Sequence, residues 1–296
     1  MTRQPKLIIH GGAGASPDSK GGVEQARKSL FQVLATVYPL LVNGASALEA
    51  VVQACTMLED DPRFNAGTGS VLQADGQIRL SASLMDGTQQ TFSGIINVVR
   101  VKNPIQLALA LQSAPDRVLS DYGAMELARE LQIPVYDPLT EERLQEWLTE
   151  RKSNFTKKMA GVVSERGTIG AVALDQTGRI CAGTSTGGRG FERIGRVSDS
   201  ATPAGNYANA YAGVSCTGVG EDILDEGLAV RIVTRVTDGM TLEQAIAKSF
   251  QEARERQRDF GAIAIDHTGA IGWAKTTSVL FAAYCDGEQM LDTLSS

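Results

Sequence analysis

A glycine followed directly by a threonine, Gly167-Thr168, stands where a short apolar segment begins, and this pair has the groups needed for nucleophilic chemistry. The segment consists of β-branched and small residues and ends in the turn 175–178, which predicts a strand leading into a hairpin. The returning strand, predicted over 179–184, runs on to Thr186. The hairpin would therefore bring a second threonine back beside Thr168.

A threonine hydroxyl is a good nucleophile only when a base takes its proton, and the amine of an N-terminal threonine can be that base. Such an amine titrates at about pH 8, far lower than lysine, so a significant fraction of it is neutral at physiological pH. We therefore predict that the Thr168 hydroxyl attacks the Gly167 carbonyl, and that cleavage of this bond leaves Thr168 as a new N-terminus. Glycine suits the attacked position because it adopts backbone conformations closed to other residues. Taken alone, the dipeptide also fits an ordinary strand start with threonine chosen for β-propensity.

The composition is that of a globular protein with a sizeable core, since 43% of the 296 residues are hydrophobic and 21% are charged. The formal net charge is −6 and no dense basic stripe occurs, so neither nucleic acid nor an anionic membrane is an expected partner. The 31 glycines gather in short motifs. This clustering indicates tight loops and not a flexible linker.

The four cysteines are widely spaced and form no pair with metal-ligand spacing. We expect them to be small buried residues in a reducing compartment. The first apolar run, Leu7-Ile8-Ile9, is too short for a signal sequence or a membrane span, which favours a cytoplasmic protein. The cysteines are Cys55, Cys181, Cys216 and Cys285.

Hydrophobic periodicity predicts helices and short strands along most of the chain. Ser46 with Glu49, and Thr241 with Gln244, have the spacing of capping boxes at helix starts. The polar and cationic stretch 152–166 predicts an exposed linker just before the threonine nucleophile. Helices are predicted over 23–41, 46–61, 104–111, 122–131, 141–150 and 241–258, strands over 7–9, 71–72, 78–85, 95–101 and from 214, and a second hairpin over 261–273.

Two glycine-rich turns follow predicted strands. The first, 10–14, lacks both the GxGxxG spacing and the P-loop lysine, so we interpret it as a tight loop packed closely against another element. The second, around Gly218 and Gly220, presents backbone N–H groups that favour an anion. His10 and His267 are interpreted as hydrogen-bonded structural residues, because no second ligand lies at zinc spacing.

Several motifs that occur together and in one order make the chain similar to a known family. It resembles the plant-type asparaginases, also called isoaspartyl peptidases, within the N-terminal nucleophile hydrolases. The resemblance runs nearly from end to end and depends on the joint order of the motifs. The motifs are His10-Gly11-Gly12-Ala13-Gly14, Phe64-Asn65-Ala66-Gly67, Met85-Asp86-Gly87, Gly167-Thr168-Ile169-Gly170-Ala171-Val172-Ala173-Leu174-Asp175, Thr184-Ser185-Thr186-Gly187-Gly188, Gly195-Arg196-Val197, Asp199 and Ser215-Cys216-Thr217-Gly218.

The resemblance implies an α+β fold, a four-layer αββα sandwich that is made as one precursor. The precursor would be split before Thr168, so that residues 1–167 form an α subunit and residues 168–296 a β subunit of one domain. A dimer of such heterodimers is implied as well. By similarity, Thr168 is the nucleophile, its freed amine is the base, and Thr186 hydrogen-bonds and tunes it.

The resemblance also implies how a substrate is held. The planar fork of Arg196 matches an α-carboxylate, and Asp199 would hold the α-ammonium. Outside this context the two residues would be taken for a solvated surface pair. The Thr217 hydroxyl and the Gly218 N–H would form an oxyanion hole, where one donor changes the rate by roughly 10²–10³-fold, and Asn65 would support the nucleophile from the α subunit. Further substrate contacts are expected from Val197, Ser198, Val219 and Gly220.

By the same likeness, the loop 58–68 would wrap a structural sodium ion through backbone carbonyl oxygens, the ligand type that suits a hard cation. No cofactor is expected for catalysis. The carbonyls expected to bind sodium belong to Leu58, Glu59, Asp61, Phe64, Ala66 and Thr68.

Two positions depart from the family pattern. Ser81 stands where the family usually carries an aspartate before Met-Asp-Gly. Ser198 stands where glycine usually lies between Arg196-Val197 and Asp199, inside the loop expected to bind substrate. The second departure leaves open which of asparagine and β-aspartyl dipeptides is preferred.

The sequence thus predicts an autoprocessed amidohydrolase that acts on a small molecule or dipeptide through an acyl-Thr168 intermediate. It would cleave the side-chain amide of L-asparagine and the isopeptide bond of β-aspartyl dipeptides. The nearest alternative is glycosylasparaginase, which a secretory signal and disulfide-spaced cysteines would favour. A nucleotide-binding protein that uses the glycine loops at Gly11 and Gly218 belongs to another class, and a family member that binds without cleaving is a third alternative.

Overall fold

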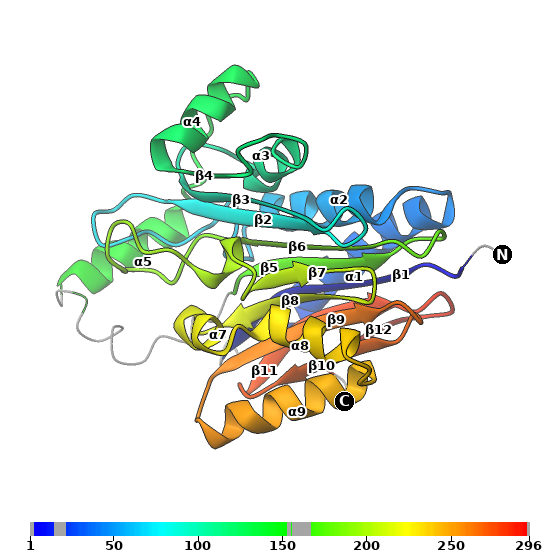
Figure 1. The fold of residues 1–296 in the computed structure, drawn as a ribbon. Helices are drawn as coiled ribbons and strands as arrows, with labels where there is room; N and C mark the ends of the chain where they lie inside the picture. The colour runs from blue at the N-terminus through cyan, green and yellow to red at the C-terminus, as the bar shows by residue number, and fades with distance from the viewer. Residues whose placement is uncertain (1–2, 15–21, 153–154, 156–166, 295–296) are drawn as a thin grey trace.

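Two β-sheets face each other at the centre of the molecule, and helices cover the outer face of each (Figure 1). The structure is a computed structural model that describes residues 3–14, 22–152, 155 and 167–294. The layers run in the order helix, eight-stranded sheet, four-stranded sheet, helix. The expected αββα sandwich is therefore confirmed.

The larger sheet has the strand order β12-β11-β1-β5-β6-β2-β3-β4. Its pairs are antiparallel apart from β3 with β4. The sheet contains strands from before and after Gly167–Thr168, with β1 inserted between β11 and β5, so the two predicted subunits share one sheet. The strands are β1 (Lys6–Gly14), β2 (Leu80–Asp86), β3 (Thr91–Val98), β4 (Val118–Ser120), β5 (Ile169–Leu174), β6 (Ile180–Thr186), β11 (Val279–Cys285) and β12 (Met290–Asp292).

The smaller sheet comes entirely from the chain after Thr168 and has the order β10-β9-β8-β7. All its neighbours are antiparallel. Its strands are β7 (Asn206–Ala208), β8 (Ala212–Gly218), β9 (Phe260–Asp266) and β10 (Ile271–Lys275).

Each helix layer is held by an apolar face. Helices α1 to α4 pack on the larger sheet, and α8 and α9 pack on the smaller one. Both predicted capping boxes are formed, at the starts of α2 and α9. The helical segments are α1 (Gly22–Val42), α2 (Ala47–Asp60), α3 (Pro104–Ala110), α4 (Asp121–Glu130), α5 (Glu141–Lys152), η1 (Asp199–Ala201), α7 (Gly220–Glu226), α8 (Leu228–Thr237) and α9 (Leu242–Glu255).

Three apolar cores fill the spaces between the four layers, because successive side chains of a buried strand point to opposite faces. On β1, for example, Leu7 and Ile9 join the core under helices α1 and α2, whereas Ile8 joins the core between the sheets. On β5, Ala171 packs toward the helices and Val172 toward the smaller sheet. Strands buried on both faces explain why these segments are apolar without interruption.

The two hairpins predicted from the repeated Asp-x-Thr-Gly turn have the same hydrogen bonds. In β5–β6, Asp175 Oδ1 accepts from the N–H and hydroxyl of Thr177 and from the N–H two residues further on. In β9–β10, Asp266 Oδ1 accepts the corresponding bonds from Thr268 and Ala270. The short carboxylate replaces missing backbone partners in each turn.

Two of the predicted strands differ from those in the structure. No strand forms at Val71 and Leu72, because their backbone groups bond to loops: Asn65 Oδ1 accepts from the Val71 N–H, and the Leu72 carbonyl accepts from Phe191. The strand predicted over 95–101 is shifted to β3, which ends near Asn97, a residue with φ of 56°. The linker predicted over 152–166 lies, apart from residues 152 and 155, outside the described residues.

None of the described helices combines the length and apolar character needed to cross a bilayer. The four cysteines are buried and free, as the sequence predicted.

Candidate active site

Three threonines meet at one end of the space between the sheets. Each lies on the side of its strand that faces the opposite sheet. Thr168 precedes β5 in the row that continues through Gly170 and Val172, and Thr186 ends the corresponding row of β6. Thr217 lies on β8 of the facing sheet, in the row that faces β5 and β6. The period of two along each strand therefore gathers three hydroxyls from distant positions.

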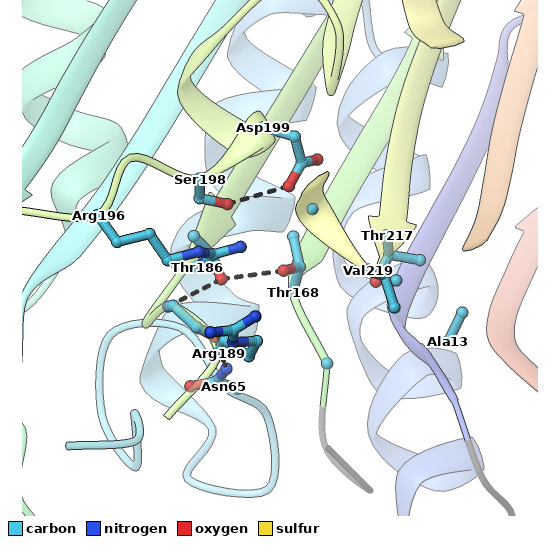
Figure 2. Close-up of a pocket in the computed structure, with 14 residues that line it drawn as sticks. Ala13, Asn65, Thr168, Thr186, Arg189, Arg196, Ser198, Asp199, Thr217 and Val219 are labelled. Carbon is cyan, nitrogen blue, oxygen red and sulfur yellow. Dashed lines mark hydrogen bonds between the residues drawn. The ribbon is translucent and has the colours of Figure 1, made fainter. Parts of the chain in front are cut away.

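The hydroxyls of Thr168 and Thr186 are in direct contact. Thr168 Oγ1 donates to Thr186 Oγ1 at 2.9 Å (Figure 2). Thr186 Oγ1 also accepts the N–H of Gly188 at 3.1 Å, so two donors fix its lone pairs. Thr186 is 1% exposed. The arrangement holds the Thr168 hydroxyl in one orientation at the pocket floor.

Asn65 joins the loop after α2 to both sides of the pocket. Its N–H donates to the Gly167 carbonyl at 3.2 Å, and its Nδ2 donates to the Gly188 carbonyl at 2.7 Å. Its carbonyl accepts from Gly187, and its Oδ1 accepts from Val71. Asn65 thus places one donor on the carbonyl that immediately precedes Thr168.

The glycine turn at the end of β1 packs against the same segment. A Cβ on Gly12, whose φ is +124°, would lie 2.4 Å from the Gly167 Cα, and a Cβ on Gly167 would lie 2.3 Å from the Gly12 Cα. Real atoms do not approach so closely, so both positions need glycine. The interpretation of this turn as a tight packing loop is confirmed.

Arg196 reaches into the pocket from the loop between β6 and η1 (Figure 2). Its Nε and Nη2 donate to the two carboxylate oxygens of Glu221 at 2.8 and 3.0 Å. Its side chain is 12% exposed, whereas that of Glu221 is 47% exposed. Because the carboxylate occupies one edge of the guanidinium fork, Nη1 remains available to a ligand.

Asp199 lies beside Arg196 and is 3% exposed. Burial raises the pKa of its carboxyl to about 7, against the lowering effects of the Ser198 hydroxyl and of Arg196. Ser198 Oγ donates to Asp199 Oδ1 at 3.0 Å, while Asp199 Oδ2 has no hydrogen-bond partner among the described residues. A buried carboxylate oxygen with no partner is costly unless a ligand supplies a donor.

The glycine turn after β8 closes the opposite wall. Thr217 is 1% exposed, and its Oγ1 finds no partner within the described part of the chain. A Cβ on Gly220 would lie 2.7 Å from Arg196 Nη2 and 2.8 Å from Asp199 Oδ1. Glycine at this position therefore leaves the arginine and the carboxylate room to face the pocket.

Both departures from the family pattern are tied to this site. The Ser198 hydroxyl accepts the N–H of Ser200 and caps η1. Ser81 Oγ accepts the N–H of Asn97, whose Nδ2 donates to the Arg196 carbonyl, each at 3.1 Å. The two serines hold the loop that carries Arg196 and Asp199 from either side.

A chain of buried polar side chains lies behind Thr168. His10 Nε2 and Ser215 Oγ are 2.9 Å apart, and Ser215 Oγ and Thr184 Oγ1 are 2.6 Å apart, all at 0% exposure. Burial lowers the pKa of His10 to about 3, and a hydrogen bond with the Thr168 backbone opposes this shift. His10 is therefore a neutral structural residue, as the sequence analysis predicted.

The pocket brings together every predicted catalytic and cleavage residue and nearly every predicted substrate contact. Val197 is the exception: this residue is 42% exposed, and it does not line the pocket. Sequence reasoning missed Arg189, although it directly follows the Thr-Gly-Gly motif. It also missed Glu221, which no motif signalled. The lining residues are Ala13, Asn65, Gly167, Thr168, Thr186, Gly188, Arg189, Arg196, Ser198, Asp199, Thr217, Gly218, Val219 and Gly220.

The loop predicted to bind sodium leaves the end of α2 and returns beside it. The carbonyls of Leu58, Glu59 and Asp61 each accept one backbone N–H and keep a second lone pair. Burial raises the pKa of the Glu59 carboxyl to about 8. The oxygens available as ligands belong to the main chain, and a hard cation prefers oxygen ligands of this kind. Among the described residues, no cluster of histidine, cysteine and carboxylate side chains suits a metal.

The αββα sandwich with two threonine hydroxyls in contact at the pocket floor has the architecture of an N-terminal nucleophile hydrolase. Residues 3–295 match the asparaginase family, so this chain belongs to that family.

Curated relatives agree with this assignment. The chain is 63% identical to an isoaspartyl peptidase/L-asparaginase of Nostoc sp., over 98% of this chain and 95% of that protein. It is 37% identical to a plant-type L-asparaginase of Pyrococcus horikoshii, over 94% of this chain and 95% of that protein. It is also 37% identical to a human isoaspartyl peptidase/L-asparaginase, over 96% and 94%.

Proposed function

We propose that this chain is an amidohydrolase that cleaves the side-chain amide of L-asparagine and the isopeptide bond of β-aspartyl dipeptides. The observation that carries the proposal is the 2.9 Å contact between the hydroxyls of Thr168 and Thr186 in a pocket that also contains Arg196 and Asp199. The names of relatives that cover nearly the whole chain support the same substrates.

The charged pair selects an aspartyl or asparaginyl unit. The remaining donors of Arg196 bind the α-carboxylate, and the unpartnered oxygen of Asp199 accepts from the α-ammonium. These two contacts direct the side-chain carbonyl toward Thr168. Asp199 must be ionised for this purpose, although burial favours its neutral form.

The reaction then proceeds by acyl transfer. The free amine of Thr168 takes the proton of its own hydroxyl, and Oγ1 attacks the carbonyl carbon. The Thr217 hydroxyl and the Gly218 N–H hold the oxyanion. As the tetrahedral intermediate collapses, the Thr168 ammonium returns the proton to the departing ammonia or amino acid. Water activated by the same amine cleaves the ester and releases aspartate.

We infer that the chain is a precursor that activates itself before Thr168. The Thr168 hydroxyl attacks the Gly167 carbonyl carbon, the amide rearranges to an ester, and water hydrolyses the ester. The Asn65 N–H on the Gly167 oxygen supports this step, because it stabilises charge where the oxyanion develops. The tight packing of Gly12 on Gly167 limits the positions that the attacked carbonyl can take.

The activity is tested by measuring ammonia released from L-asparagine and leucine released from β-aspartyl-leucine. Wild type should hydrolyse both, and Thr168→Ala should lower each rate by at least about 10³-fold. Thr149→Ala on the exposed face of α5 is a matched control that should retain both rates. Hydrolysis that survives in Thr168→Ala, or its absence in the wild type, contradicts the proposal.

We also propose a structural sodium ion in loop 58–68, bound by the carbonyls of Leu58, Glu59, Asp61, Phe64, Ala66 and Thr68. The main-chain oxygens of this loop support the proposal. Sodium chloride should raise the Tm above that in choline chloride at equal ionic strength. Equal Tm values would reject the site.

A dimer of heterodimers is proposed from the family resemblance. Exposed apolar side chains around α4 support an interface: Val118, Tyr122 and Val135 are 47%, 67% and 82% exposed. Light scattering should give a mass about twice the 31.4 kDa of one chain, whereas a mass of one chain rejects the dimer.

The buried free cysteines support a reducing, cytoplasmic location, and secretion of the native protein would reject it.

A further inference from the structure

We propose that Arg189 forms a subsite for the carboxylate of the amino acid that follows the β-aspartyl unit, and so favours β-aspartyl peptides with a free C-terminus. The inference rests on the proposed function and names a substrate class for the same site.

The first argument is the count of charges that each substrate presents. L-Asparagine carries one α-carboxylate and one α-ammonium, which Arg196 and Asp199 accommodate. A β-aspartyl dipeptide carries a second carboxylate on its leaving amino acid. Of the residues described as lining the pocket, only Arg196 and Arg189 are cationic. Arg189 is therefore the cation available to the second carboxylate.

The second argument is that the backbone of Arg189 is fixed next to the nucleophile. The preceding Gly188 donates its N–H to Thr186 Oγ1 and accepts from Asn65 Nδ2 on its carbonyl. The N–H of Arg189 donates to the buried carboxylate of Glu192 at 3.1 Å. The side chain thus begins at a defined point on the rim of the pocket, near Thr186 (Figure 2).

The third argument is that the Arg189 guanidinium is only weakly engaged. Its Nη1 lies 3.7 Å from Glu221 Oε1, beyond hydrogen-bond distance, while Arg196 holds the same carboxylate at 2.8 Å. The Arg189 side chain is 40% exposed. Its planar fork can therefore turn to a substrate carboxylate at the pocket mouth without breaking a buried pair.

The test compares β-aspartyl-leucine with β-aspartyl-leucine amide, which lacks only the second carboxylate. In wild type, kcat/KM should be about fivefold higher for the acid, a modest factor because the pair is partly exposed. Arg189→Gln should bring the acid-to-amide ratio close to one, and Arg189→Lys, which keeps a point charge, should give an intermediate ratio. Arg193→Gln removes the same charge from an exposed neighbour outside the pocket lining and should keep the wild-type ratio.

Rates are normalised to the fraction of each preparation that is cleaved before Thr168, measured by mass spectrometry, so that an effect on processing does not enter the ratio. If both Arg189 variants still hydrolyse the peptides but lose kcat/KM equally for the acid and the amide, the inference is overturned and the proposed function stands. A change of ratio in Arg193→Gln as large as in Arg189→Gln would also overturn it. Failure of wild type to hydrolyse either peptide would instead overturn the proposed function, and the inference with it.

Discussion

Asp199 must be negatively charged for its proposed task of binding the α-ammonium, but its buried position favours the neutral carboxyl. Burial raises the pKa to about 7, and the neighbouring Glu221 carboxylate adds to the shift. Because the folded pKa lies above the unfolded value, the stability that this group contributes is greatest at low pH. It is lost as pH rises from about 4 to 7. Above pH 7 the ionised Asp199 therefore lowers the folding stability of the free protein, and the α-ammonium of a bound substrate offsets this cost.

This shift predicts the pH dependence of activity. Asp199 and the Thr168 amine must both be deprotonated, and the amine titrates at about pH 8. A plot of log kcat/KM for L-asparagine against pH should rise with a slope approaching two below pH 7 and of one between the two pKa values. A slope of one or less down to pH 5 would show that Asp199 is ionised throughout or is not needed.

Individual residues differ in how well their sequence signals them. Thr168 and Thr186 were predictable from the hairpin that joins them, whereas the Arg196 loop was predictable only through the family resemblance. Arg189 and Glu221 were not, because exposed charged residues next to glycines are common and only the folded chain brings these two to one pocket. The hydrogen bond from Ser198 to Asp199 likewise depends on the 3₁₀ turn that follows.

At the scale of elements, the site depends on the rows of β5, β6 and β8 that face one another. Gly170 lies opposite His10 and Thr184, in the middle of the polar chain behind Thr168. Because Gly170 has no side chain, Ser215 of the smaller sheet has room to contact His10 and Thr184. The hairpins and helix caps were predictable from local patterns, whereas the pairing of β1 between β5 and β11 was not, because it joins segments distant in sequence.

A substitution in this row should destabilise the fold. In Gly170→Ala, the new Cβ would lie 2.0 Å from Ser215 Oγ and 2.5 Å from His10 Nε2. Overpacking of this kind costs about 1–3 kcal/mol, so thermal unfolding should show a lower Tm. Gly123→Ala in α4 is the control, since its Cβ would meet only Leu119 Cδ2 at 4.0 Å and should leave Tm unchanged or raise it. Equal Tm values for Gly170→Ala and wild type would refute the packing argument.

At the scale of the whole molecule, the predicted cleavage point lies directly before β5, a central strand of the sheet that both predicted subunits share. β1 pairs with β5 and β2 pairs with β6, so strands from before and after Thr168 are hydrogen-bonded neighbours. A cut at Gly167–Thr168 would leave these ladders intact. The two products should stay associated under native conditions and separate only when the fold is lost.

Denaturing mass spectrometry of purified protein tests the central claim most directly, because it detects the cut that turns Thr168 into an N-terminal nucleophile. Wild type should give two fragments, the second starting at Thr168, and Thr168→Ala should give one uncut chain. An uncut wild-type chain that hydrolyses β-aspartyl peptides at full rate would contradict the account.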